Sequence, residues 1–196
     1  MISNDENNNL ILISGGGPAG FGAALAFSNN NYKNIIVLES RSDMNFDEDN
    51  SYPVGINVRG RNAIKNLNPS KQEQELDWNT FGLKVDQWKI IVGPGLNVAN
   101  FDSGLVYGTS RASVTEMLYK KIIQHRSDSI KILFGHKTKS VDLKSKTVTC
   151  ETTSQAGVET KTFKPSCFVV ADGYRSKARD FLAESDQTLK VQTWNW

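Results

Sequence analysis

The sequence has 196 residues, a length that suits one domain or one domain with an insertion. Hydrophobic residues make up 38% of it and charged residues 22%, so the chain can bury a core in the way of ordinary globular proteins. Its 23 basic and 21 acidic residues give a net charge of +2, which offers no electrostatic reason to expect nucleic acid or a membrane surface as a partner.

The cysteines and histidines predict neither disulfides nor a metal site. Cys150 and Cys167 are too few for a disulfide framework, so we expect reduced thiols. Together with His125 and His136 they lack the spacing of metal ligands. Residues 1–9 are acidic and asparagine-rich, unlike a signal peptide, and no apolar stretch reaches membrane-spanning length. We therefore expect a disordered N-terminus at residues 1–9 and a cytoplasmic protein.

Residues 10–41 have the pattern of a strand, a turn, a helix and a second strand. The apolar run at 10–13 predicts a buried strand, the small residues at 21–27 favour a helix, and the β-branched run at 35–38 predicts the second strand. Glu39 ends that run, 24 residues after the first glycine of the turn. The turn has the pattern G-x-G-x-x-G and consists of Gly15, Gly16, Gly17, Pro18, Ala19 and Gly20.

This spacing predicts a dinucleotide site. Gly15 permits a tight turn, Gly17 lets the backbone approach a pyrophosphate, and Gly20 lets the helix pack close to the strand. Glu39 would bind the ribose hydroxyls. Arg41 could grip the 2′-phosphate of NADP, but the carboxylate of Glu39 would repel that phosphate, which favours FAD or NAD. The alternative is a plain turn without a ligand.

The middle of the chain predicts an insertion into this dinucleotide fold. The segment 51–69 favours an extended entry and then a short helix, with Ala63, Ile64 and Leu67 facing inward. Short apolar runs between residues 81 and 108 flank a Gly-Pro-Gly sequence, and this predicts a β-hairpin.

The second half alternates again between helix and strand. Ser113 and Glu116 have the spacing of a capping box at the start of an amphipathic helix. A strand is predicted at 130–134, a polar β-meander at 138–163, and a second buried strand at 168–170.

A second motif, ADGYRSKAR at 171–179, follows the last predicted strand. The strand end places Asp172 at the carboxyl edge of the sheet, where open α/β sheets bind ligands. Gly173 allows a backbone to approach closely, and Ser176 and Arg179 follow in a predicted helix. The alternative is a helix N-cap with a nearby salt bridge.

The two motifs together resemble the flavin-dependent aromatic hydroxylases, the single-component monooxygenases that include p-hydroxybenzoate hydroxylase and kynurenine 3-monooxygenase. The sequence GGGPAG is similar to their FAD pyrophosphate loop, and Glu39 with Arg41 to the pair that holds the adenosine end. Arg111 is similar to their arginine near the flavin and pyrophosphate, and VRGRNAI at 58–64 most resembles the kynurenine 3-monooxygenase branch. Their D-G-x-x-S-x-x-R motif, which serves FAD and pyridine nucleotides, is similar to Asp172, Gly173, Ser176 and Arg179.

The resemblance implies an α/β fold: a Rossmann-like FAD-binding domain of three layers with a mostly parallel sheet, a β-meander and part of a substrate-domain insertion. The FAD-binding domain would span 10–185, with the insertion around 81–108. NADH or NADPH would reduce FAD, and one atom of oxygen would pass to an aromatic or electron-rich small molecule. The motifs supply no dedicated acid or base, so we name no catalytic residue.

One departure from the family concerns length. Members are considerably longer and carry a G-D-A-x-H motif that this sequence lacks, so 186–196 would be the truncated start of a substrate-domain sheet. We therefore expect an N-terminal or truncated portion of such a monooxygenase, with a missing C-terminal half. The alternatives are an inactive FAD-binding fragment, a protein-binding relative of the GDP-dissociation-inhibitor type, and an NAD-linked oxidoreductase.

Overall fold

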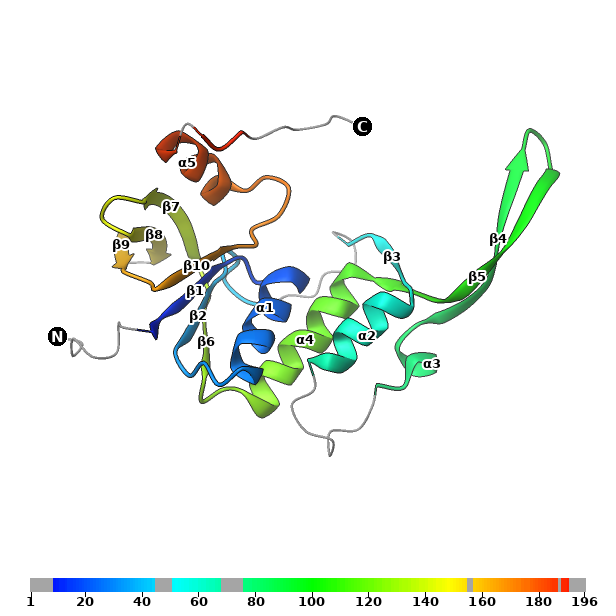
Figure 1. Ribbon diagram of the computed structural model, residues 1–196, viewed down its shortest axis with the longest axis horizontal. Coiled ribbons are helices and arrows are strands. Elements are labelled where there is room, and N and C mark those ends of the chain that lie inside the picture. Colours follow the sequence, from blue (N-terminus) through cyan, green and yellow to red (C-terminus); the bar gives the residue numbers. More distant parts are fainter. Residues whose placement is uncertain (1–8, 45–50, 68–75, 155–156, 187, 191–196) are drawn as a thin grey trace. The chain divides into compact units, whose positions relative to one another are not determined.

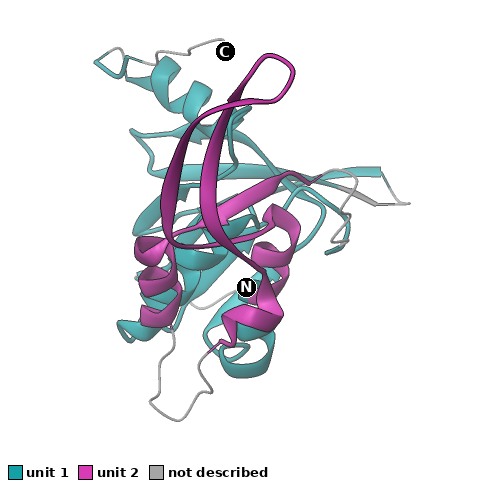
Figure 2. Cartoon of the chain, turned by 90° about the vertical axis from the view of Figure 1, so that its right-hand side faces the viewer, with its two compact units in different colours: residues 1–45, 118–196 teal, residues 46–117 magenta. Residues whose placement is uncertain are grey.

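The computed structural model divides the chain into two compact units (Figures 1 and 2). Unit 1 comprises residues 1–45 and 118–196, and unit 2 comprises residues 46–117. The structure describes residues 9–44, 51–67, 76–154, 157–186 and 188–190. Most of the two predicted terminal segments, the disordered N-terminus and the truncated sheet start, lies outside these described residues.

Unit 1 is built on a four-stranded parallel sheet in the order β10-β1-β2-β6. Its strands are β1 (Ile11–Ser14), β2 (Ile35–Leu38), β6 (Ile130–Leu133) and β10 (Cys167–Val170). They confirm the four predicted strands to within one residue at each end. Helix α1 (Pro18–Asn29) connects β1 to β2 and confirms the predicted helix. β10 is half-buried rather than buried, because it is an edge strand among the described residues.

The two faces of the parallel sheet pack against different elements, because successive side chains of a strand point to opposite faces. On one face Ile13 lies beside α1, and the ring of Phe21 lies 5.9 Å from that of Tyr119 in α4 (Arg111–His125). On the other face the sheet forms a hydrophobic core with the antiparallel β-meander, made by Leu10, Leu12, Leu38, Val141, Val148, Cys150 and Phe163.

The β-meander confirms the prediction for 138–163. Its strands are β7 (His136–Asp142), β8 (Thr147–Ser154) and β9 (Gly157–Phe163), paired in that order. The last helix, α5 (Lys177–Ser185), lies against β7, where the hydroxyl of Ser185 donates to the carbonyl oxygen of Val141 at 3.1 Å. Apolar side chains of α5 pack on the same core.

Unit 2 holds an antiparallel sheet in the order β3-β5-β4. Its elements are β3 (Pro53–Ile56), α2 (Val58–Asn66), α3 (Trp78–Phe81), β4 (Leu83–Val92), β5 (Leu96–Ser110) and the first residues of α4. β4 and β5 form the predicted hairpin around a turn at 93–95, and both strands are longer than the apolar runs indicated. Gly93 and Gly95 have φ angles of 62° and 98°, a region that favours glycine.

Two local predictions in unit 2 differ from the structure. Ala63 is exposed, whereas Ile64 and Leu67 are half-buried, and no residue of the mainly polar helix α2 is fully buried. Helix α4 begins at Arg111, so Ser113 lies inside its first turn and is not the cap. Instead, the backbone N–H of Ser113 donates to Oγ of Ser110 at 2.9 Å.

Neither thiol of the described residues forms a disulfide: Cys150 is buried and Cys167 half-buried. Burial raises the pKa of the Cys150 thiol, which keeps it protonated. Over the same described ranges, no three histidine, cysteine or acidic side chains are arranged to hold a metal ion. None of the described helices is long and apolar enough to cross a lipid bilayer.

Candidate functional site

The glycine-rich turn joins the carboxyl end of β1 to the amino end of α1. Gly15 has a φ of 105°, and a Cβ atom there would lie 2.4 Å from the carbonyl oxygen of Ala171. A Cβ atom at Gly20 would lie 1.8 Å from the carbonyl oxygen of Gly15, so both positions require glycine. At Gly17 a Cβ atom would meet nothing within 4 Å, and the space beside the turn is open.

The amino end of α1 has no side-chain cap. Gly17 is the N-cap residue, Pro18 supplies no N–H, and no acidic residue lies in the first turn. The backbone N–H of Phe21 donates to the carbonyl oxygen of Gly17 at 2.9 Å, and this is the first hydrogen bond of the helix. Within the described part of the chain, the N–H groups of Ala19 and Gly20 in the first turn have no acceptor, so this end of the helix can bind an anion.

Glu39 follows β2 and turns its carboxylate toward the glycine-rich turn. The residue is 5% exposed, and its Oε2 accepts the backbone N–H of Gly16 at 2.7 Å. Arg41 donates to Oε1 from its backbone N–H at 2.8 Å and from Nε at 3.1 Å. Its Nη2 also donates to the carbonyl oxygen of Gly16 at 3.3 Å. Glu39, Arg41 and Gly16 therefore form one closed network at the edge of the turn.

The charge of Glu39 follows from this network. Burial alone would raise the pKa of Glu39, but hydrogen bonds from Arg41, the positive charge of that residue and the N–H of Gly16 outweigh burial and hold the pKa below its usual value. Glu39 is consequently an ionised carboxylate at neutral pH. Such a group accepts hydrogen bonds from hydroxyl groups and repels phosphates.

The Asp172 motif lies at the carboxyl end of β10, next to the glycine-rich turn. A Cβ atom at Gly15 would lie 2.8 Å from Cα of Asp172, so the two motifs touch through their backbones. The hydroxyl of Ser176 donates to Oδ1 of Asp172, and the N–H of Ala178 donates to Oδ2 at 3.2 Å. Oγ of Ser176 accepts the N–H of Arg179 at 3.0 Å. These side chains cap α5, as the alternative interpretation of this motif predicts.

The rest of the Asp-Gly motif faces a cavity of about 600 Å³. Gly173 has a φ of 85°, and a Cβ atom there would meet nothing within 4 Å. The guanidinium of Arg179 donates to the carbonyl oxygen of Tyr174 and to Asp180, both at 3.2 Å, while its buried Nε has no partner among the described residues. The cavity is lined by Val170, Asp172, Gly173, Ser176, Arg179, Leu182, Ala183, Leu189 and Lys190.

Arg111 belongs to unit 2, where it is the first residue of α4. Its backbone N–H donates to the carbonyl oxygen of Tyr52 at 3.0 Å. Its guanidinium lies 5.7 Å from the centroid of the aromatic ring of Tyr52. Its role toward a cofactor stays a prediction. The structure brings together the glycine-rich turn, the Glu39 network and the Asp172 motif, all of them in unit 1.

The sequence pattern did not predict a buried polar pair, Ser14 and Thr138, next to the glycine-rich turn. Oγ of Ser14 and Oγ1 of Thr138 lie 2.8 Å apart and are hydrogen-bonded, which links the end of β1 to β7. The signal for Ser14 is a hydroxyl residue at the end of an apolar run, directly before the glycines. The sequence contains no such signal for Thr138, because its partner is 124 residues away.

No protein-family model matches the sequence, and no curated protein matches it either. Several solved structures, however, are similar to this chain. p-Nitrophenol 4-monooxygenase PnpA from Pseudomonas putida DLL-E4 is 19% identical with a TM-score of 0.69, over 89% of this chain and 44% of that chain. 2-Methyl-3-hydroxypyridine-5-carboxylic acid oxygenase is 18% identical with a TM-score of 0.69, over 89% and 42%.

A third structure, the flavin-dependent monooxygenase PieE in complex with FAD and substrate, is 19% identical with a TM-score of 0.66. The match covers 90% of this chain and 31% of that chain. The chain thus spans less than half the length of these three proteins. At such identities the likeness concerns the fold: this mixed α/β chain, with one parallel and two antiparallel sheets, has a fold found in flavin-dependent monooxygenases.

Proposed function

We propose that the chain is the FAD-binding part of a flavin-dependent monooxygenase of the aromatic hydroxylase family, with a Rossmann-like unit formed by β1, α1 and β2. The observation that carries this proposal is the uncapped amino end of α1 beside the buried, ionised Glu39. One group attracts a pyrophosphate and the other accepts hydrogen bonds from a ribose, which are the two parts that flank each other in a dinucleotide. The fold likeness to a monooxygenase in complex with FAD supports the choice of FAD.

Each described residue of the site would have a distinct task. The open space at Gly17 admits the pyrophosphate to the N–H groups of α1. Glu39, kept ionised by Arg41, binds the ribose and disfavours a 2′-phosphate, which speaks against NADP at this position. We assign Asp172, Gly173 and Arg179 to the same cofactor because their motif touches the turn.

Bound FAD would carry electrons from NADH or NADPH and deliver an oxygen atom to an aromatic or electron-rich small molecule. The protein's part is to hold the cofactor and to exclude water, so we assign no acid–base residue. We assign Arg111 to the cofactor as well. The likeness of residues 58–64 to kynurenine 3-monooxygenases is a hypothesis about the substrate. We expect the protein in the cytoplasm.

The test is a set of calorimetric titrations of the chain with FAD, FMN and NADH. FAD should bind with a 1:1 stoichiometry, and FMN should bind at least about tenfold more weakly because it lacks the adenosine and one phosphate. Equal binding of FMN, or no uptake of FAD, would contradict the proposal. Binding of NADH in preference to FAD would favour the NAD-linked oxidoreductase. FAD uptake without oxygen consumption in a longer protein would favour the inactive relative.

A further inference from the structure

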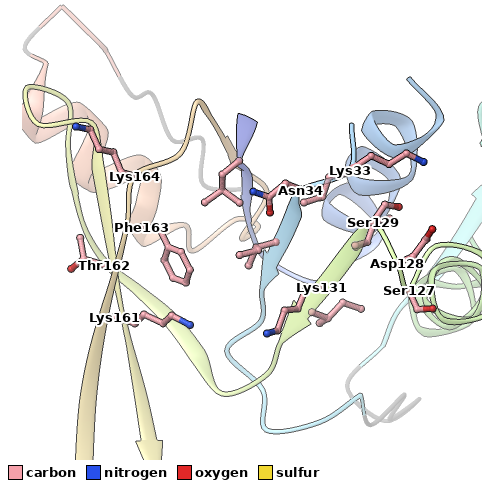
Figure 3. Close-up of a pocket in the computed structure, with 15 residues that line it drawn as sticks. Lys33, Asn34, Ser127, Asp128, Ser129, Lys131, Lys161, Thr162, Phe163 and Lys164 are labelled. Atoms are coloured by element: carbon pink, nitrogen blue, oxygen red, sulfur yellow. The ribbon is translucent and has the colours of Figure 1, made fainter. Parts of the chain in front are cut away.

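A second cavity of unit 1 lies at the amino ends of the parallel strands, where β1, β2 and β6 begin (Figure 3). The glycine-rich turn lies at the opposite, carboxyl end of β1. Its volume is about 720 Å³, within the range of small-molecule sites. The charged residues of its lining are Lys33, Lys131, Lys161, Lys164 and Asp128. Four positive charges and one negative charge leave a net +3, more than the +2 of the whole chain.

The lysines come from separate parts of unit 1. Lys33 precedes β2, Lys131 lies on β6, Lys161 lies on β9, and Lys164 follows β9. None of the four forms an ion pair with another described residue. The fold therefore brings positive charges from different parts of unit 1 to one cavity, where they attract an anion.

Two of the lysines face each other. The ammonium groups of Lys131 and Lys161 point toward one another across the opening in Figure 3, and the ring of Phe163 points into the space beside them. Nζ of Lys161 lies 5.2 Å from the centroid of that ring. The remaining wall is mixed: it includes apolar side chains such as Leu10 and Ile132 and polar ones such as Ser129. The cavity thus combines several positive charges with an aromatic ring and part of an apolar wall.

We propose that this cavity binds a small organic dianion with an apolar body, of the class of aryl phosphates, and that Lys131 and Lys161 bind its anionic group. This site is separate from the dinucleotide site, since the four residues of β1 separate the cavity from the glycine-rich turn by about 13 Å. The proposal does not rest on the FAD proposal, and either one can fail alone.

The experiment uses phenyl phosphate as the probe, with inorganic phosphate as the charge-only comparison. Amide chemical shifts are recorded by NMR during each titration, with and without saturating FAD. Phenyl phosphate should shift the amides of 129–132 and 161–164 whether or not FAD is present. It should bind roughly fivefold more tightly than inorganic phosphate because its ring leaves water.

Paired charge reversals provide the control. The variant with Lys131→Glu and Lys161→Glu should bind phenyl phosphate about tenfold or more weakly. The variant with Lys89→Glu and Lys144→Glu, which has the same net charge but lies outside the lining, should bind within about twofold of wild type. If the first variant does not fold, as judged by circular dichroism, Lys131→Gln and Lys161→Gln replace it. Equal losses in both pairs, shifts confined to the glycine-rich turn, or no shifts at all would overturn the proposal.

Discussion

Gly20 and Gly17 belong to the same turn, yet the structure gives them different tasks. A Cβ atom at Gly20 would lie 1.8 Å from a backbone oxygen, whereas one at Gly17 would lie in open space. Gly20→Ala should therefore lower the free energy of unfolding by about 3 kcal/mol, because backbone atoms would have to move. Gly17→Ala should cost less than about 1 kcal/mol. Urea unfolding measures both, and equal losses would contradict the assigned tasks.

Glu39 should make stability depend on pH. Its pKa is lowered in the folded state, so its contribution is present above the unfolded value of about 4.3 and is lost as the pH falls through the folded value. Glu39→Gln should therefore be less stable than wild type at pH 7 by about 1–3 kcal/mol, and the difference should shrink at pH 3.

The matched control for Glu39 is Glu159→Gln, since Glu159 is an exposed acid on β9. Urea unfolding of this variant should follow wild type at both pH values. A loss of stability in Glu39→Gln that is the same at pH 3 and pH 7 would contradict the proposed charge network.

At the scale of single elements, α5 depends on the side chains that precede it. Ser176 caps the helix through the N–H of Arg179, and Asp172 accepts hydrogen bonds from Ser176 and Ala178. Ser176→Ala should lower the free energy of unfolding by about 1 kcal/mol. Ser145→Ala, in the exposed turn between β7 and β8, serves as the control for loss of a hydroxyl group.

The same helix distinguishes two interpretations of the Asp172 motif. If the motif only caps α5, Ser176→Ala changes stability and leaves FAD affinity as it is. If the capped helix also holds Gly173 and Arg179 in place for the cofactor, FAD affinity falls by about threefold or more in calorimetry at a temperature where both proteins are folded.

For the molecule as a whole, the hairpin of unit 2 carries unusual apolar exposure. Leu83, Ile91 and Leu96 are 81%, 60% and 65% exposed. Trp88 of the same hairpin is also exposed at 51%. Long apolar strands with free edges promote association between chains. We expect concentration-dependent self-association, measurable by analytical ultracentrifugation.

Replacing two exposed apolar residues of this hairpin with lysine should prevent that self-association. Ile91→Lys combined with Val98→Lys should remain monomeric at concentrations where wild type associates, because both side chains are exposed and the added charges repel. FAD affinity should not change, since neither residue lies in the candidate site. Unchanged self-association of this double variant would show that the chains meet through another surface.

The sequence by itself determined the local elements near the glycine-rich turn. Apolar four-residue runs predict β1 and β2, small residues predict α1, and the Gly-Pro-Gly sequence predicts the hairpin. These features depend on side-chain periodicity and on backbone freedom at glycine, which are properties of neighbouring residues. The need for glycine at Gly20 is part of the same local pattern, because a Cβ atom there would meet the carbonyl oxygen of Gly15.

Only the tertiary structure decided which distant groups meet. The order β10-β1-β2-β6 brings Ala171 to Gly15, and the meander brings Thr138 to Ser14. Four lysines from different parts of unit 1 line one cavity at the amino ends of the parallel strands. The exposure of the hairpin likewise depends on packing. Such contacts join residues far apart in the chain, and sequence periodicity carries no information about them.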